Sequence, residues 1–82
     1  MIIVTIDHLS GEPAYQQLAR ILREGIGSGT YAVGTHVPSA KTLSQQHGIA
    51  VGTVMRAFDV LRDEGLIRSV PGRGMFVIRK TA

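Results

Sequence analysis

The chain has 82 residues, 44% hydrophobic and 18% charged, with no cysteine, and this composition excludes a disulfide framework and a disordered chain and indicates one domain. Nine Lys or Arg against six Asp or Glu give a net charge of +3, a mild excess on average. No run of apolar residues exceeds four, whereas a membrane span needs about 18, so we expect a soluble, cytoplasmic protein with no membrane partner.

Residues 1–12 are predicted to form an extended N-terminal arm. Every second residue from Ile2 to Ile6 is branched and apolar, which is typical of an arm or a short strand. These apolar residues are a candidate dimerisation surface.

A first helix is predicted from Pro13, because proline suits the first helical position. Its apolar residues recur at three- and four-residue spacing, at Tyr15, Leu18, Ala19, Leu22 and Ile26. We expect Gln16 and Gln17 on the opposite, polar face. Gly27 and Gly29 predict the end of the helix, because glycine takes a positive φ at little cost.

Two further helices are predicted around a tight turn. Ser39 is a candidate N-cap for a short helix that ends at Gly48. A second apolar pattern ends at Gly65 and comprises Val51, Val54, Ala57, Phe58 and Leu61. Two helices joined by three or four residues with a glycine indicate a helix-turn-helix, although a generic helical hairpin gives a similar pattern.

A β-hairpin is predicted to follow the helices. "LIRSV" (66–70) and "MFVIR" (75–79) are β-prone, and "PGRG" between them supplies Gly72 and Gly74 for a turn with positive φ. This order of elements indicates an α+β, mainly α, winged helix-turn-helix: three helices followed by a two-stranded wing. We expect this domain to span residues 13–79 and to be followed by a tail, 80–82.

Positive charge is concentrated at the C-terminal end of the chain. After Gly65 there are four basic residues and no acidic one: Arg68, Arg73, Arg79 and Lys80. Such a cluster is the electrostatic footprint of a nucleic-acid binder, or else a solvated basic tail. Charge alone leaves both interpretations open.

Several separated motifs resemble one known family. "YQ" at 15–16, "PS" at 38–39, "TVMRA" at 53–57, "EGLI" at 64–67 and "GRGMFV" at 72–77 occur in the order found in the N-terminal winged helix-turn-helix of GntR-family bacterial transcriptional regulators. "SGEPAYQQL" resembles the short regulators of the YtrA-like branch. The chain can be a short regulator of this kind or a domain of a longer one.

The resemblance implies a sequence-specific regulator, most often a repressor, that binds double-stranded operator DNA as a homodimer. The helix after Ser39 would position phosphates, the next helix would enter the major groove, and the wing would lie at the minor groove. The candidate DNA-binding residues are Ser39, Lys41, Thr42, Val51, Gly52, Thr53, Met55, Arg56, Gly72, Arg73 and Gly74. On the wing strands, Arg68 and Arg79 are candidate phosphate contacts.

The chain departs from the family pattern at four positions. Members typically carry an arginine at the position of Lys41, a Ser or Thr followed by an arginine at Ala50 and Val51, and a basic residue at Met55. Lysine lacks the two-pronged hydrogen bonding of arginine to guanine, so we expect Lys41 to attract phosphate. Ala50 also provides no N-cap.

Enzyme and cofactor chemistry find little support in the sequence. "GTYAVGTH" (29–36) has the glycine spacing of a phosphate loop, but Thr35 and His36 replace its Lys and its Ser or Thr. The three histidines lack metal-ligand spacing. We expect no catalysis, metal, cofactor or small-molecule effector site in this chain. The alternative function is a winged-helix module for protein interaction or dimerisation without DNA binding.

Overall fold

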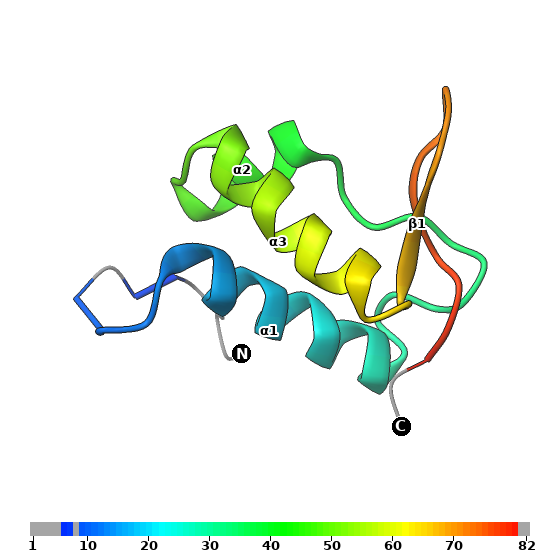
Figure 1. Cartoon of the computed structure of the whole chain (residues 1–82), viewed down its shortest axis with the longest axis horizontal. Coiled ribbons are helices and arrows are strands. Elements are labelled where there is room, and N and C mark those ends of the chain that lie inside the picture. Colours follow the sequence, from blue (N-terminus) through cyan, green and yellow to red (C-terminus); the bar gives the residue numbers. More distant parts are fainter. Residues whose placement is uncertain (1–5, 8, 81–82) are drawn as a thin grey trace.

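The computed structural model describes residues 6–7 and 9–80. Helices α1 (Ala14–Ser28), α2 (Ala40–His47) and α3 (Val51–Asp63) precede strands β1 (Ile67–Val70) and β2 (Gly74–Val77), which pair antiparallel. α3 packs against α1, α2 and β1 (Figure 1). The predicted α+β, mainly helical, winged helix-turn-helix is confirmed.

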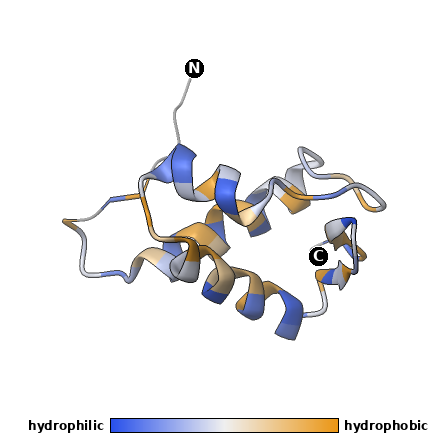
Figure 2. Cartoon of the chain, turned by 90° about the horizontal axis from the view of Figure 1, so that it is seen from above, coloured by the Kyte–Doolittle hydropathy of each residue, from blue (hydrophilic) through white to orange (hydrophobic). Residues whose placement is uncertain are grey.

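One hydrophobic core joins the helices to the hairpin. Hydrophobic and hydrophilic residues alternate along the helices (Figure 2), as amphipathic helices require. The fully buried large side chains come from every element and from both strands: Leu18, Leu22, Ile26, Leu43, Val54, Leu61, Ile67 and Val77. α3 therefore forms the centre of the domain, with its buried face on the core and its opposite face in solvent.

The helix ends follow the predicted capping residues, with two corrections. Ser39 caps α2, and Gly48 ends it at φ 65°. Pro13 is the N-cap residue of α1 rather than its first helical residue. Gly27 lies within α1, and Gly29, at φ 90°, ends it, because only a residue past the last turn needs the left-handed conformation.

A segment before α2 adds a third short extended piece to the hairpin. The backbone N–H of Gly34 donates to the Val77 carbonyl, and the Val77 N–H donates to the Thr35 carbonyl, both at 2.9 Å. His36 forms an isolated antiparallel bridge with Phe76, and their rings meet edge to face. No sequence pattern predicted this pairing, which anchors β2 to the loop between α1 and α2.

The strands are shorter than their β-prone runs. β1 begins at Ile67, and β2 ends at Val77, so the prediction that Arg79 lies on a wing strand is wrong. Arg79 follows the strand, and its guanidinium donates to the backbone carbonyl of Glu64 at the base of the hairpin. That bond closes the chain after β2 onto the end of α3.

Half of the predicted N-terminal arm, residues 1–5 and 8, lies outside the described residues. Of the apolar residues proposed as a dimerisation surface, the structure describes Ile6, which is 7% exposed and belongs to the core. Ile6 is therefore covered within the domain itself. Among the described residues, no helix combines the length and hydropathy needed to cross a membrane.

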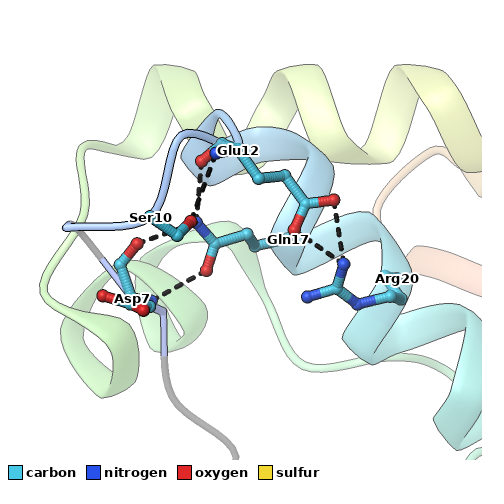
Figure 3. Close-up of polar contacts among 5 residues, drawn as sticks. All are labelled: Asp7, Ser10, Glu12, Gln17 and Arg20. Atoms are coloured by element: carbon cyan, nitrogen blue, oxygen red, sulfur yellow. Dashed lines mark hydrogen bonds and ion pairs between the residues drawn. The ribbon is translucent and has the colours of Figure 1, made fainter.

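Gln17 joins the segment before α1 to the helix. Its Oε1 accepts from the Asp7 N–H at 2.8 Å, and its Nε2 donates to the carbonyls of Asp7 at 2.9 Å and Glu12 at 2.8 Å (Figure 3). Gln17 is only 3% exposed, so its expected place on the polar face is wrong. Buried polar groups require partners, and here the backbone of the preceding turn supplies them.

Replacing Gln17 by leucine should lower the free energy of unfolding by about 1–3 kcal/mol, because it leaves backbone groups of Asp7 and Glu12 without their partner. Urea denaturation measures the change. The control is Gln16→Leu at the adjacent, exposed position, for which we expect a change within about 0.5 kcal/mol. Equal losses in the two variants would show that the network contributes nothing specific.

Candidate nucleic-acid interface

A groove of about 580 Å³ separates the hairpin from α2 and α3. Five of the eleven predicted site residues line it: Ser39, Thr42, Met55, Arg73 and Gly74. They come from the start of α2, the middle of α3 and the hairpin, so the fold brings together segments that lie far apart in the sequence. In the view of Figure 1, the hairpin tip projects toward the same side as α2, with α1 on the other side of α3.

The start of α2 is held by its own side chains. Ser39 Oγ accepts from the Thr42 N–H at 3.1 Å and donates to Thr42 Oγ1 at 2.9 Å. The Ser39 hydroxyl is therefore committed to the cap, and its part at the interface is to fix the helix end. Lys41, in the first turn, is exposed.

The start of α3 has no side-chain cap. Ala50 occupies the N-cap position without a side-chain acceptor, so the backbone N–H groups of Val51 and Gly52 have no hydrogen-bond partner among the described residues, whereas the Thr53 N–H donates to the Ala50 carbonyl at 3.0 Å. Val51, one of the predicted DNA-binding residues, is 47% exposed, because the first turn of α3 reaches beyond the core. Gly52 is exposed and Thr53 half-buried.

Met55 and Arg56 point in different directions from α3. Met55 is 47% exposed and lines the groove. The Arg56 guanidinium instead lies 4.1 Å from the centroid of the Tyr15 ring of α1, a cation–π contact. No local sequence signal indicated this contact, since Tyr15 and Arg56 are far apart in the chain.

The wing ends in a turn that places Arg73 in solvent. The Arg73 N–H donates to the Val70 carbonyl at 2.9 Å and closes the turn. Gly72 at φ 75° and Gly74 at φ 102° confirm the predicted positive-φ glycines, a conformation that side chains with a Cβ rarely adopt. Arg68, on β1, is also exposed.

The charges divide the molecule into two regions. Neither residues 25–58 nor residues 65–82 contain an Asp or Glu, so α2, the start of α3 and the hairpin carry only positive charge. Among the described residues, no carboxylate forms an ion pair with Lys41, Arg68 or Arg73. These cations can therefore bind an external anion without first breaking an ion pair within the described chain.

The ion pairs of the described residues lie elsewhere. Arg20 pairs with Glu12, and Arg62 pairs with Asp59. Arg23 donates two hydrogen bonds to Glu64, at 2.8 and 2.5 Å, and thereby joins α1 to the residue after α3. These bonds hold the pKa of Glu64 below its usual value and raise the pKa of Arg23.

The last residue of α2 adds no charge at neutral pH. Burial lowers the pKa of His47 below its ordinary value of 6.5, because a desolvated imidazole is less stable in its charged form. Its Nδ1 is buried without a hydrogen-bond partner. The cations of this face are therefore the lysine and the arginines.

A helix-turn-helix with a basic wing is an architecture typical of the DNA-binding domains of transcriptional regulators. The family model of the bacterial regulatory proteins of the gntR family matches residues 14–77. The chain belongs to this family, which confirms the resemblance of the sequence motifs. The matched region is a DNA-binding domain of regulators and not an enzyme domain.

The chain is similar to regulators from several organisms. It is 41% identical over 68 residues to the HTH-type transcriptional regulator YjiR of Escherichia coli, and 35% identical over 69 residues to YdfD of Bacillus subtilis. These matches cover 83% and 84% of the chain but 14% of each relative. The chain thus spans a small part of the length of these relatives.

Solved structures of DNA-binding regulators share its fold. YtrA from Sulfolobus acidocaldarius, a GntR-family transcription factor, superposes with a TM-score of 0.85 at 34% identity, over 98% of this chain and 84% of that one. The DNA-binding domain of AraR in complex with its operator ORX1 gives a TM-score of 0.80 at 32% identity, over 87% and 88% of the two chains.

Proposed function

We propose that this chain binds operator DNA as a homodimer and represses transcription, with α3 in the major groove and the wing at the minor groove. The observation that carries the proposal is the groove between α2, α3 and the hairpin: no acidic residue is among the described residues that line it, and it is lined by Arg73, which has no ion-pair partner among the described residues. Binding to the chromosome would place the protein in the cytoplasm. A dimer would match the two-fold symmetry of a palindromic operator.

Helix α2 would fix the protein on the phosphate backbone. The Lys41 ammonium is exposed and has no ion-pair partner within the described part of the chain, so it would attract a phosphate, while Ser39 and Thr42 keep the helix end in place. Contacts to phosphate set the register of a protein on DNA without identifying bases.

The start of α3 would come closest to the bases. Its uncapped N–H groups suit a phosphate or a base acceptor, and the half-buried Thr53 can add one hydroxyl. The Arg56 guanidinium is held over the Tyr15 ring. From that position it would contribute its positive charge to DNA binding and would not contact a base.

Gly52 supports this arrangement because nothing within the described chain requires a glycine there. A Cβ added to Gly52 would meet no atom within 4 Å, and glycine inside a helix costs about 0.5–1 kcal/mol relative to alanine. The absence of a side chain at Gly52 would let the DNA surface approach the backbone of α3, which offsets the lower helix stability of glycine.

Gly52→Ala should therefore raise the free energy of unfolding by about 0.5–1 kcal/mol while weakening DNA binding. Urea denaturation and fluorescence anisotropy measure the two effects on one preparation. The matched control is Gly11→Ala, another position where a Cβ would meet nothing within 4 Å, which should leave the affinity unchanged. Tighter DNA binding by Gly52→Ala would contradict close approach at this position.

The wing would hold the minor groove through Arg73. The turn presents its guanidinium between two glycines that lack side chains, so the backbone of the tip can approach the DNA closely. The negative potential of a narrow minor groove attracts such a long cation.

The test is a titration with duplex from the promoter beside the protein's own gene, compared with a shuffled duplex of the same composition. We expect the promoter duplex to bind at least about 10³-fold more tightly, with two protomers per duplex by analytical ultracentrifugation. Equal affinity for both duplexes would contradict sequence-specific binding, and one protomer per duplex would contradict the dimer. No binding to either would favour the protein-interaction module.

A further inference from the structure

Two large apolar side chains on the outward face of α3 remain in solvent. Val51 and Met55 are each 47% exposed, and residues four apart on a helix lie next to each other on its surface. We call these two residues the α3 apolar pair. The pair lies on the turns of α3 that are proposed to enter the major groove.

The hydrogen-bonding groups around the pair are few. From Ala50 to Met55 the side chains are apolar or absent except for the hydroxyl of Thr53, which is half-buried. Arg56, the next residue, stacks on Tyr15. This surface therefore has little capacity to identify guanine, adenine or cytosine through the bidentate hydrogen bonds that other side chains make.

The major groove contains one apolar group that such a surface can recognise. Thymine presents its C5-methyl group there, and the other bases of unmodified DNA present hydrogen-bond donors and acceptors. Against a polar base edge, Val51 and Met55 would displace water without replacing its hydrogen bonds, which is unfavourable. Against a methyl group they would bury apolar surface on both sides, which is favourable.

Charge favours DNA over an apolar protein surface as the occupant. Lys41, Arg68 and Arg73, which have no ion-pair partner among the described residues, lie on elements that flank α3, and the nearest acidic residue of α3, Asp59, is paired with Arg62. A partner of this surface must therefore be polyanionic and carry small apolar groups. Duplex DNA containing thymine meets both requirements.

We propose that the α3 apolar pair selects operator positions that carry a pyrimidine C5-methyl group, which in unmodified DNA means thymine. This inference rests on the proposed function, because it requires α3 to enter the major groove. Burial of one methyl group corresponds to about a fourfold change in affinity.

The test replaces thymine by 2′-deoxyuridine in the promoter duplex, first throughout and then one position at a time. This change removes the C5-methyl group and keeps the base pairing and the phosphates. Anisotropy titrations should show weaker binding to the uracil duplex, by about fourfold for each contacted methyl group.

A paired variant separates methyl recognition from changes in the duplex itself. Combined Val51→Ala and Met55→Ala, at two exposed positions, should bring the ratio of thymine to uracil affinities close to one. The matched control is Ile78→Ala, which removes an apolar side chain that is likewise 47% exposed but lies beyond β2. For Ile78→Ala, the ratio of the affinities for the thymine and uracil duplexes should equal that of the protein without substitutions.

Two results would overturn the inference while leaving the proposed function intact. One is equal affinity of the unmodified protein for the two duplexes, and the other is an unchanged ratio in the Val51→Ala and Met55→Ala variant. Failure to bind the thymine duplex at all would instead contradict the proposed function itself.

Discussion

Replacing Arg73 by alanine should weaken binding to every duplex by about tenfold per protomer, and so by about 100-fold for a dimer with both wings on the DNA. The guanidinium projects from the wing tip and has no ion-pair partner among the described residues. We therefore expect its removal to lower the affinity for DNA and to leave the stability of the fold unchanged. The slope of log affinity against log salt should become shallower by about one unit per protomer.

The matched control is Arg79→Ala, which removes the same charge from the base of the hairpin. The Arg79 guanidinium donates to the Glu64 carbonyl, and we expect this variant to change the affinity and the salt slope much less. Equal losses in the two variants would show that net charge, and not the wing tip, determines affinity.

Replacing Leu61 by alanine should lower the free energy of unfolding by about 2–5 kcal/mol. Leu61 is fully buried in the core that joins α3 to α1 and the hairpin, so its truncation leaves a cavity at the centre of the domain. A chain of this length has a total stability of about 4–12 kcal/mol, so the loss approaches half of it. Urea denaturation measures the change.

Met55→Ala provides the control on the same helix. Met55 is 47% exposed, so its truncation should change stability by less than about 0.5 kcal/mol. Leu61→Ala would reduce DNA binding only through the unfolded fraction, and therefore least at low temperature and without denaturant. A loss of less than about 1 kcal/mol in Leu61→Ala would contradict the packing described for the core.

Local patterns predicted the elements of the fold because each depends on neighbouring residues. The buried stripe Val54, Ala57, Phe58 and Leu61 follows from helical spacing, and the ends at Ser39, Gly48 and Gly72 follow from the conformations that these residues favour. The order of the elements and the family motifs then determined the fold class.

The features that sequence patterns missed depend on contacts between distant segments. Gln17 falls outside the three- and four-residue spacing of the apolar residues of α1. It is nevertheless buried, because the turn before the helix folds over it. The pairing of residues 34–37 with β2, and of Arg56 with Tyr15, likewise joins segments far apart in the chain. Periodicity also cannot show where the core ends along a helix, since Val51 has the spacing of the buried residues of α3 but is 47% exposed.

The same limit applies to the candidate site. The residue types at 39–42, 51–56 and 72–74 indicated a surface for DNA, but which of them share a groove depends on how the hairpin packs on α3. The structure also separates two roles that the sequence could not, since the Ser39 hydroxyl is committed to its helix cap while Lys41 has no ion-pair partner among the residues that the structure describes.

The most direct test of the central claim, that the face formed by α2, α3 and the wing binds duplex DNA, is the salt dependence of that binding. Anisotropy titrations of the labelled promoter duplex between about 50 and 200 mM salt give the slope of log affinity against log salt concentration. With about three to five phosphates neutralised by each protomer, we predict a slope of roughly −3 to −5 per protomer, or about −6 to −10 for a dimer. Absence of binding to any duplex, or an affinity independent of salt, would contradict the claim.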